Sequence, residues 1–374
     1  MESVRLLHCA DLHLGAEVVR LGTRSRARRA EFRRTFHRIL ELAKEEKVNL
    51  LLIAGDLFDV PVVPEELCTE VRDAFAAAYP LQIALCSGNH DPATCDSVYL
   101  REDFWPENVT VFASGLAIKE FPELGVRLLG AGFTSTYCSH TLLRRVSLPA
   151  DDLLNIGIMH GTLVSEGQGS EHNPITLRQI EASGLRYLAL GHIHTRKEPA
   201  KAGETTYAYP GCTEGRKFGE NGPKGVYIAD VSRYSCNVRF VPVCERRLEC
   251  LEVDISEAET LGDVASLVRK AMEKAAGKGY REQIFRVTVK GEQAEGLCFG
   301  IEELESALSD VWYLEVQDKT LPFVDEAGFG AGGSIQSVFL KKLAEREENV
   351  KASRLEMARK YGLRAFLGPV DIEN

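Results

Sequence analysis

Five clusters of aspartate, histidine and asparagine lie in the first two thirds of the sequence, each directly after a short apolar run. The clusters are Asp11-Leu12-His13, Gly55-Asp56-Leu57-Phe58-Asp59, Gly88-Asn89-His90-Asp91, Met159-His160-Gly161 and Gly191-His192-Ile193-His194. Residues two apart on an extended backbone point to the same side, so two side chains of one cluster can grip a single ion. A lone histidine is more often structural than a ligand, but the recurrence of such clusters favours metal binding.

These side chains supply oxygen and nitrogen ligands without a thiolate, which suits Mn²⁺, Fe²⁺ or Zn²⁺. The candidate metal ligands are Asp11, His13, Asp56, Asn89, His160, His192 and His194. They are too many for one ion with open coordination positions, so the pattern favours two ions about 3.5 to 4 Å apart that share a carboxylate. Such a pair would lower the pKa of a bound water and stabilise charge at a phosphorus centre.

The apolar runs before the clusters are predicted to be buried strands. They cover residues 4–7, 50–54, 83–86, 155–159 and 187–190. Apolar residues at three-to-four spacing predict one helix after the first run, and a second helix is expected from Pro64 to about Ala78. The first helix is marked by Phe32, Phe36, Ile39, Leu40 and Ala43. Strands separated by helices predict α/β layering, in which ligands collect beyond the carboxyl ends of the strands, so we expect all five clusters around one cleft.

The length of 374 residues exceeds what one hydrophobic core usually serves, so a larger and a smaller domain are expected. We predict a first domain at residues 1–245, a small α+β domain at 246–325 and a helical C-terminal segment at 326–374. In that last segment a helix is expected from about Ser334 to Tyr361, with Val338, Phe339 and Leu343 on one apolar face.

Composition narrows the class of protein. Apolar residues make up 44% and charged residues 27%, which fits a globular chain, and the formal net charge of -10 argues against a uniformly basic nucleic-acid binder. Ten cysteines, none spaced as Cys-x-x-Cys, and the lack of a signal-peptide pattern predict reduced thiols in a cytoplasmic protein. The most apolar run, residues 50–54, is far too short to span a membrane, so no membrane association is expected.

In order and spacing, the five clusters resemble the full signature of the calcineurin-like metallophosphoesterases. Further segments resemble the SbcD-type DNA-repair nuclease subunits and their YhaO-like relatives. These segments are Cys9-Ala10-Asp11-Leu12-His13-Leu14-Gly15, Tyr209-Pro210-Gly211, Gly215-Arg216-Lys217-Phe218 and Gly225-Val226. The resemblance is strong over residues 1–245 and only architectural beyond them. It implies a metallophosphoesterase β-sandwich flanked by helices, with the small α+β domain capping the cleft.

The resemblance implies two metal sites that share Asp56 and hold two Mn²⁺, with Fe²⁺ or Zn²⁺ as alternatives. The first site would be formed by Asp11, His13, Asp56 and His194. The second site would be formed by Asp56, Asn89, His160 and His192.

Two further residues receive a catalytic role from the resemblance. His90 matches a residue that contacts the scissile phosphate and assists proton transfer to the leaving oxygen, and Asp91 is expected to orient its ring. Asp59, at a place that is histidine in some relatives, is given a secondary role. The histidines outside the signature are interpreted as structural or surface residues; they are His8, His37, His140 and His172.

Eight arginines and one glutamate between residues 20 and 38 form a basic stretch in an acidic chain. Such a run is commonly a solvated helix face. Its position soon after the first metal pair favours contacts with the phosphate backbone of DNA, because the planar guanidinium matches phosphate oxygens. The candidate DNA-binding residues are Arg24, Arg26, Arg28 and Arg29.

The leading hypothesis is a two-metal phosphodiesterase that acts on DNA in double-strand-break repair and recombination. The resemblance implies 3′ to 5′ exonuclease activity together with endonuclease activity. The alternative is a small-molecule phosphoesterase, such as a cyclic-nucleotide phosphodiesterase, because the metal signature is common to both. A non-catalytic scaffold is disfavoured because every expected ligand and His90 are present.

The C-terminal segment has two open interpretations. Its apolar face can dock on the protein's own surface, which is the commoner fate of an amphipathic helix. The resemblance instead implies that it binds an SMC-like ATPase subunit of the SbcC type. A homodimer also stays open, because members of the resembled family often dimerise through helices of the nuclease domain.

Overall fold

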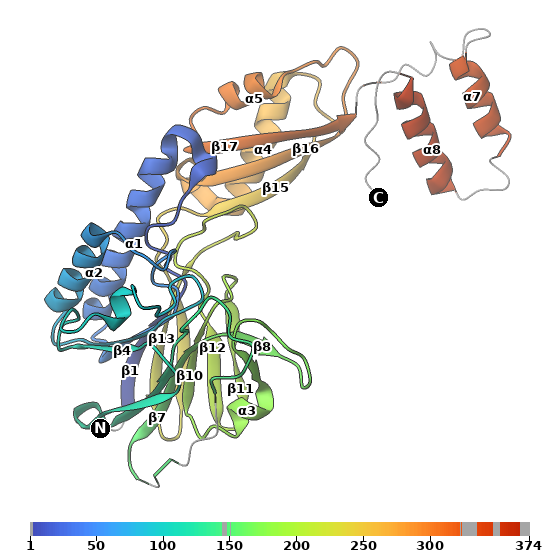
Figure 1. Cartoon of the computed structure of the whole chain (residues 1–374). Helices are drawn as coiled ribbons and strands as arrows, with labels where there is room; N and C mark the ends of the chain where they lie inside the picture. Colours follow the sequence, from blue (N-terminus) through green and yellow to red (C-terminus); the bar gives the residue numbers. More distant parts are fainter. Residues whose placement is uncertain are drawn as a thin grey trace. The chain divides into compact units, whose positions relative to one another are not determined.

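The computed structural model describes residues 3–143, 148–149, 151–321, 323, 335–346 and 352–366. The chain divides into two compact units, Met1–Glu249 and Cys250–Asn374 (Figure 1). The first unit contains strands and helices in alternation along its first hundred residues, so the predicted α/β layering is confirmed.

The first sheet of unit one contains the first four strands of the chain. It contains β1 (Ser3–Cys9), β2 (Leu50–Ala54), β3 (Gln82–Cys86), β4 (Val109–Phe112), β13 (Gly225–Ser232) and β14 (Cys236–Pro242). The order is β14-β13-β1-β2-β3-β4. The pairs from β1 to β4 are parallel, so their carboxyl ends meet at one edge, and β13 joins β1 in the antiparallel direction.

The second sheet of unit one also has a parallel centre. It contains β5 (Ala117–Phe121), β6 (Val126–Ala131), β7 (Leu154–His160), β10 (Tyr187–Gly191), β11 (Lys197–Ala202) and β12 (Thr205–Tyr209). The order is β11-β12-β10-β7-β6-β5, with β6, β7, β10 and β12 parallel. A small two-stranded sheet of β8 (Thr162–Val164) and β9 (Pro174–Thr176) follows β7.

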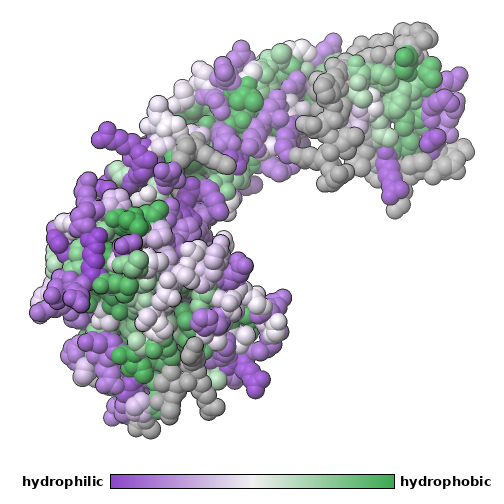
Figure 2. Space-filling model, in the orientation of Figure 1, coloured by the Kyte–Doolittle hydropathy of each residue, from purple (hydrophilic) through white to green (hydrophobic). Residues whose placement is uncertain are grey.

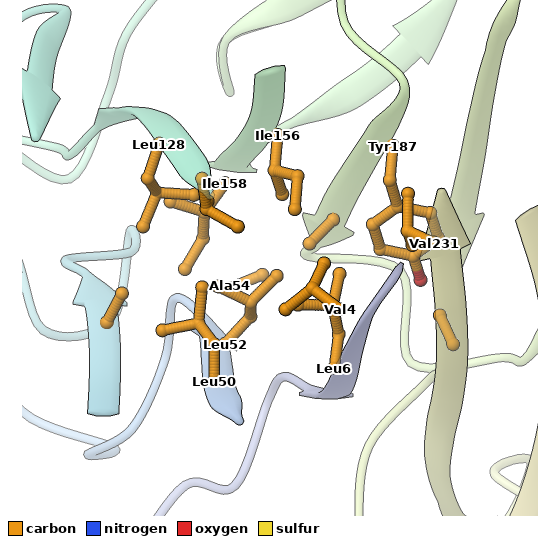
Figure 3. Close-up of a cluster of buried hydrophobic side chains, with 14 of the residues drawn as sticks. Val4, Leu6, Leu50, Leu52, Ala54, Leu128, Ile156, Ile158, Tyr187 and Val231 are labelled. Atoms are coloured by element: carbon orange, nitrogen blue, oxygen red, sulfur yellow. The ribbon is translucent and has the colours of Figure 1, made fainter. Parts of the chain in front are cut away.

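The hydrophobic core of unit one lies between the two sheets, as Figure 3 shows. The side chains that meet there from the two sides are Val4, Leu6, Leu50 and Leu52 against Leu128, Ile156, Ile158 and Tyr187. The strand β2 is buried at all five positions. Such a continuous apolar run is typical of a strand covered on both faces, by the second sheet on one side and by helices on the other.

The helices of the first sheet are α1 (Ser25–Glu45) and α2 (Glu65–Ala77), which correspond to the two predicted helices. Phe36 of α1 and Phe75 of α2 are buried and pack edge to face, with ring centroids 5.6 Å apart. Pro64 precedes α2, where its missing N–H costs no helical hydrogen bond. On the face drawn in Figure 2, hydrophilic side chains predominate over these helices, as expected for helices with one buried stripe.

Further helices complete the described chain up to residue 321. They are the helices α3 (Leu177–Glu181), α4 (Leu261–Ala276) and α5 (Ile301–Ala307), and the 3-10 helices Val19–Arg24, Val98–Leu100, Pro122–Leu124 and Gly277–Glu282. Within the described residues, no helix combines the length and apolarity that crossing a membrane requires.

The second unit contains a three-stranded sheet with its own core. The strands are β15 (Leu248–Asp254), β16 (Ile284–Glu292) and β17 (Tyr313–Leu321), with β16 and β17 parallel. Val264, Val268 and Met272 of α4 and Leu304 of α5 are fully buried in the core with the strand residues. This is the α+β arrangement that the sequence predicts for this part of the chain.

The C-terminal part contains two described helices, α7 (Ile335–Ala344) and α8 (Ala352–Ala365), where one helical segment from about Ser334 to Tyr361 is predicted. Ser334, residues 347–351 and the glycine-rich stretch 328–333 lie outside the described residues. The Phe339 ring packs against Phe366, with centroids 5.8 Å apart, so part of the predicted apolar face is used within this pair of helices.

Candidate metal centre

The loops that follow β1 and β2 are joined by backbone hydrogen bonds. The Asp11 N–H donates to the Gly55 carbonyl at 3.1 Å, and the His13 N–H donates to the Asp56 carbonyl at 3.0 Å. Because β1 and β2 are parallel neighbours, these bonds hold the first two residue clusters together beyond the carboxyl ends of both strands.

Two hydrogen bonds cross from the second sheet to the first at the same edge. His160, the last residue of β7, donates from Nδ1 to the Ala54 carbonyl at 2.9 Å. The His192 N–H donates to Asp11 Oδ1 at 3.0 Å. A Cβ on Gly191 would lie 1.9 Å from the Ala54 oxygen, so glycine is required where the sheets approach this closely.

Four of the candidate ligands have left-handed backbone conformations that non-glycine residues rarely adopt. Their φ values are 53° for Asp11, 47° for His13, 49° for Asp56 and 100° for His192. Each such residue costs roughly 1 to 3 kcal/mol and persists only where the surroundings impose it. Strain of this kind concentrates at functional sites. Here it turns the candidate ligands toward one another, whereas an unstrained strand end would leave them apart.

One set of ligand atoms gathers around His13. One oxygen or nitrogen atom from each of four residues lies within 4.8 Å of the others, and these residues are Asp11, His13, Asp56 and His194. They are the four residues predicted for the first metal site. Three of them are buried, so the cluster is shielded from water on most sides.

The two histidines of this set are arranged as two ligands of one cation. The Nδ1 atom of His13 faces Asp59 Oδ1 at 3.0 Å, and the Nδ1 atom of His194 faces Glu220 Oε1 at 2.8 Å. A proton on Nδ1, on the side of each ring that faces a carboxylate, leaves Nε2 with a bare lone pair for an ion. These Nε2 atoms lie only 3.1 Å apart, a separation that suits two ligands of one ion.

A second set of ligand atoms lies around Asn89. Asn89 Oδ1 is 2.9 Å from His160 Nε2 and 2.9 Å from His192 Nδ1. The bond from His160 Nδ1 to the Ala54 carbonyl leaves its Nε2 without a proton, so that atom is available as a ligand. The three residues predicted for the second metal site, in addition to Asp56, are therefore brought together.

Asp56 lies between the two sets. Its Oδ1 accepts the His90 N–H at 2.9 Å, whereas its buried Oδ2 has no hydrogen-bond donor. Oδ2 is 3.7 Å from His13 Nε2 and 3.5 Å from His160 Nε2. A carboxylate oxygen that is unsatisfied, buried and adjacent to both nitrogen sets fits the bridging ligand of a pair of divalent cations.

Burial sets the protonation of these groups. It lowers the pKa of His13 to about 4 and the pKa values of His160 and His192 to about 3, so their rings are neutral and ready to bind metal. Burial, together with the nearby charge of Asp56, raises the pKa of Asp11 to about 7. A divalent cation would favour the ionised form of that carboxylate.

The prediction that Asp91 orients the ring of His90 is wrong. Asp91 accepts hydrogen bonds from the Gly88 N–H at 2.7 Å, the Phe58 N–H at 2.9 Å and the Tyr99 hydroxyl at 2.5 Å. Its oxygens are directed to these groups, so the buried Asp91 shapes the loop instead of orienting the ring of His90.

Asp59, instead of Asp91, lies beside the ring of His90. Its Oδ1 and its backbone carbonyl each lie 3.4 Å from His90 Nδ1, and the interaction with the carboxylate raises the pKa of His90. The His90 ring also packs edge to face on His13, with centroids 4.7 Å apart. His90 is therefore next to the first ligand set, half exposed, and favoured in its proton-donating form.

Two charged residues of the site, Arg216 and Glu220, were not predicted from the sequence. Arg216 donates from Nη1 to Asp59 Oδ1 at 2.5 Å, and Glu220 holds His194. Burial opposes ionisation of Glu220, but the hydrogen bond with His194 lowers its pKa to about 2. The segment Gly215-Arg216-Lys217-Phe218 signalled Arg216 without indicating a role, whereas Glu220 carries no sequence signal of its own.

The basic stretch is only partly available for DNA. Arg28 is 0% exposed and forms ion pairs with Glu31 at 2.7 Å and Glu214 at 2.6 Å, so its predicted contact with DNA is excluded by burial. Arg26 and Arg29 are exposed on α1, and Arg24 is partly exposed. The later arginines of the run pair with glutamates; they are Arg33, Arg34 and Arg38.

Residues 4–196, more than half of the chain, match the calcineurin-like phosphoesterase family. The chain belongs to this family. Membership indicates hydrolase activity on phosphate esters with divalent metal ions, and all five residue clusters fall within the matched region. The mixed α/β fold of unit one is consistent with this family.

Two relatives of this calcineurin-like phosphoesterase cover most of its length. The uncharacterized metallophosphoesterase YhaO of Bacillus subtilis (strain 168) is 26% identical over 343 residues, 86% of this chain and 83% of that protein. The DNA double-strand break repair protein Mre11 of Aeropyrum pernix is 27% identical over 321 residues, 77% of this chain and 74% of that protein. A crystal structure of TT1561 from Thermus thermophilus aligns at a TM-score of 0.41 and 11% identity, over 64% of this chain and 99% of that one.

Proposed function

We propose that the chain is a two-metal phosphodiesterase that acts on DNA, with 3′ to 5′ exonuclease and endonuclease activity in double-strand-break repair and recombination. The position of Asp56 Oδ2 between two convergent ligand sets supports the two-metal part of this proposal. The similarity to a DNA double-strand break repair protein over three quarters of both chains supports the choice of DNA.

Each ligand set would hold one of the two ions. The first ion would be held by Asp11, His13, Asp56 and His194. The second would be held by Asp56, Asn89, His160 and His192. The donor set suits Mn²⁺, with Fe²⁺ or Zn²⁺ as alternatives, and the ions would supply a metal-activated hydroxide and neutralise charge on phosphate oxygens.

His90 would donate a proton to the leaving oxygen, while Asp59 holds its Nδ1 side. A positioned acid contributes about 10² to 10⁴ in rate. Arg216 donates to Asp59 and fixes it, so that the imidazole keeps one orientation.

The test uses linear duplex DNA labelled at either the 5′ or the 3′ end, with purified protein and Mn²⁺. The wild-type protein should shorten the labelled strand from its 3′ end, and His90→Gln should reduce the rate by about 10² or more without loss of bound metal. His37→Gln, on the exposed face of α1, is the matched control and should cut at the wild-type rate. Hydrolysis of cyclic nucleotides without any action on DNA would replace this proposal with the small-molecule alternative.

We also propose that the C-terminal helices bind an SMC-like ATPase subunit. Val338 on α7 is 51% exposed, whereas Phe339 next to it packs against α8. Val338→Asp should therefore weaken co-purification with the ATPase, while Lys341→Gln on the same helix should not. Full co-purification of the Val338→Asp protein would place the partner elsewhere.

A further inference from the structure

A cavity of about 700 Å³ lies at the carboxyl ends of β4 and β6. Its walls include Ser114, Gly132, Phe133, Thr134, Tyr137 and His140. The strand β6 is the parallel neighbour of β7, which ends in His160. The cavity therefore opens at the same edge of the second sheet as the candidate ligands of the second ion.

Aromatic rings connect the cavity to that ligand set. Phe133 packs edge to face on His160, with centroids 5.6 Å apart. Tyr137 lies 6.0 Å from the ring of His172, and His172 is stacked on His192 at 4.7 Å with an angle of 29° between the planes. One wall thus contacts His160 directly, and the other reaches His192 through a single intervening ring.

The wall that carries Tyr137 is held firmly against the metal centre. The Cys138 N–H donates to the Glu171 carbonyl at 2.7 Å, and the Asn173 N–H donates to the Cys138 carbonyl at 2.6 Å. The fully buried Asn173 donates from Nδ2 to the His160 carbonyl at 2.7 Å. Because the same residue bonds to both segments, the cavity wall and the ligand His160 keep a fixed separation.

The walls have the chemistry of a site for a heteroaromatic ring. Tyr137 is 64% exposed, a large aromatic face left open to solvent beside a catalytic centre. Ser114, Thr134 and His140 add hydroxyl and imidazole groups that can hydrogen-bond to a ring edge. Among the described residues that line the cavity none is acidic, so a ligand attached to a phosphate meets no like charge there.

We propose that this cavity receives the base of an unpaired nucleotide adjoining the scissile phosphate, with Tyr137 as the stacking surface. The proposal rests on the proposed action on DNA and adds a binding site for the base. Stacking on an aromatic side chain is tolerant of sequence, because every base has a flat π face. The site would therefore favour a frayed or single-stranded terminus without selecting a particular base.

The test compares single-stranded oligonucleotides that carry normal nucleotides with oligonucleotides in which an abasic residue replaces the nucleotide on either side of the cleaved phosphate. For the wild-type protein, removal of the base from one of these positions should raise KM about tenfold. Tyr137→Ala should raise KM about tenfold on normal DNA and show no further rise on the abasic substrate. Tyr137→Phe should restore the wild-type values, because the ring is retained.

Tyr234→Ala is the matched control, since Tyr234 is 88% exposed outside the described lining of this cavity. It should leave KM unchanged on every substrate. Equal KM values for Tyr137→Ala and wild type on normal DNA, or additive losses from Tyr137→Ala and base removal, would overturn the base site while leaving the nuclease proposal intact. Failure of the wild-type protein to cut any DNA would overturn both.

Discussion

Arg216 Nη1 and Asp59 Oδ1 form an ion pair at 2.5 Å beside the candidate metal centre. The same carboxylate oxygen lies 3.0 Å from His13 Nδ1 and 3.4 Å from His90 Nδ1. Burial alone would raise the pKa of Asp59, but its hydrogen bonds with both histidines outweigh burial and hold the pKa well below its usual range. One ionised carboxylate therefore links a candidate metal ligand to the candidate proton donor.

Asp59→Asn should shift the alkaline limb of the kcat profile to lower pH by about one unit. Asp59 raises the pKa of His90, and a general acid works only below its pKa, so loss of the carboxylate makes the acid fail earlier as pH rises. Arg216 lowers the pKa of His90 through its charge, so Arg216→Gln should move the limb the opposite way. Steady-state rates from pH 6 to 10 would measure both shifts. If the alkaline limb moved in the same direction in both variants, the proposed effects of Asp59 and Arg216 on His90 would be contradicted.

Asp56→Asn should reduce the bound divalent metal from two ions to one or fewer. The amide can still accept the His90 N–H, but it supplies no negative oxygen to both ligand sets. The rate should fall by about 10² or more, since even outer-shell partners of a metal are worth 10 to 100-fold. Elemental analysis of the dialysed protein would give the metal content, and Glu41→Gln on exposed α1 is the control. Retention of two ions by Asp56→Asn would remove the bridging role.

Metal binding should release more protons at pH 6 than at pH 8, because Asp11 gives up a proton to the ion only at the lower pH. Burial raises the pKa of Asp11 to about 7, so its carboxyl is mostly protonated at pH 6 and must lose that proton to the ion. The histidine ligands with pKa values of about 3 to 4 are already neutral and release nothing. Calorimetry in buffers of different ionisation enthalpy would count the protons. Equal release at both pH values would show that Asp11 is not the competing group.

Arg28→Met should lower the free energy of unfolding by about 3 to 5 kcal/mol, because it leaves Glu214 buried without a cation and leaves Glu31 with Arg246 alone. The exposed Arg29→Met, one position along α1, should change it by no more than about 0.5 kcal/mol. Urea unfolding followed by circular dichroism would measure both. Similar effects for the two variants would mean that the buried ion pairs contribute little.

Replacing both Arg26 and Arg29 by glutamine should reduce the slope of log K against log salt for duplex DNA by about 2, if each neutralises one phosphate. Both side chains are exposed on α1. Binding titrations at several salt concentrations would give the slope, and Arg34→Gln, whose partner is Glu245, is the control. An unchanged slope would assign these arginines to a solvated helix face.

The strands and the convergence of the ligand clusters were accessible from the sequence because each cluster follows a buried apolar run. Helical spacing likewise predicted the buried face of α1 through Phe36. The burial of Arg28 was not predictable, since nothing near it in the sequence shows that Glu214 lies opposite. Asp91 follows His90 directly in the sequence, but the folded loop turns it to Phe58 and Tyr99 and brings Asp59 to the imidazole.

The hydrogen bonds from His160 to the Ala54 carbonyl and from His192 to Asp11 each run from one sheet to the other. The candidate ligands therefore join the two sheets, in addition to their proposed role in binding ions. Sliding one sheet over the other would separate both ligand sets at the same moment, so we expect partial loosening of unit one to release the two proposed ions together.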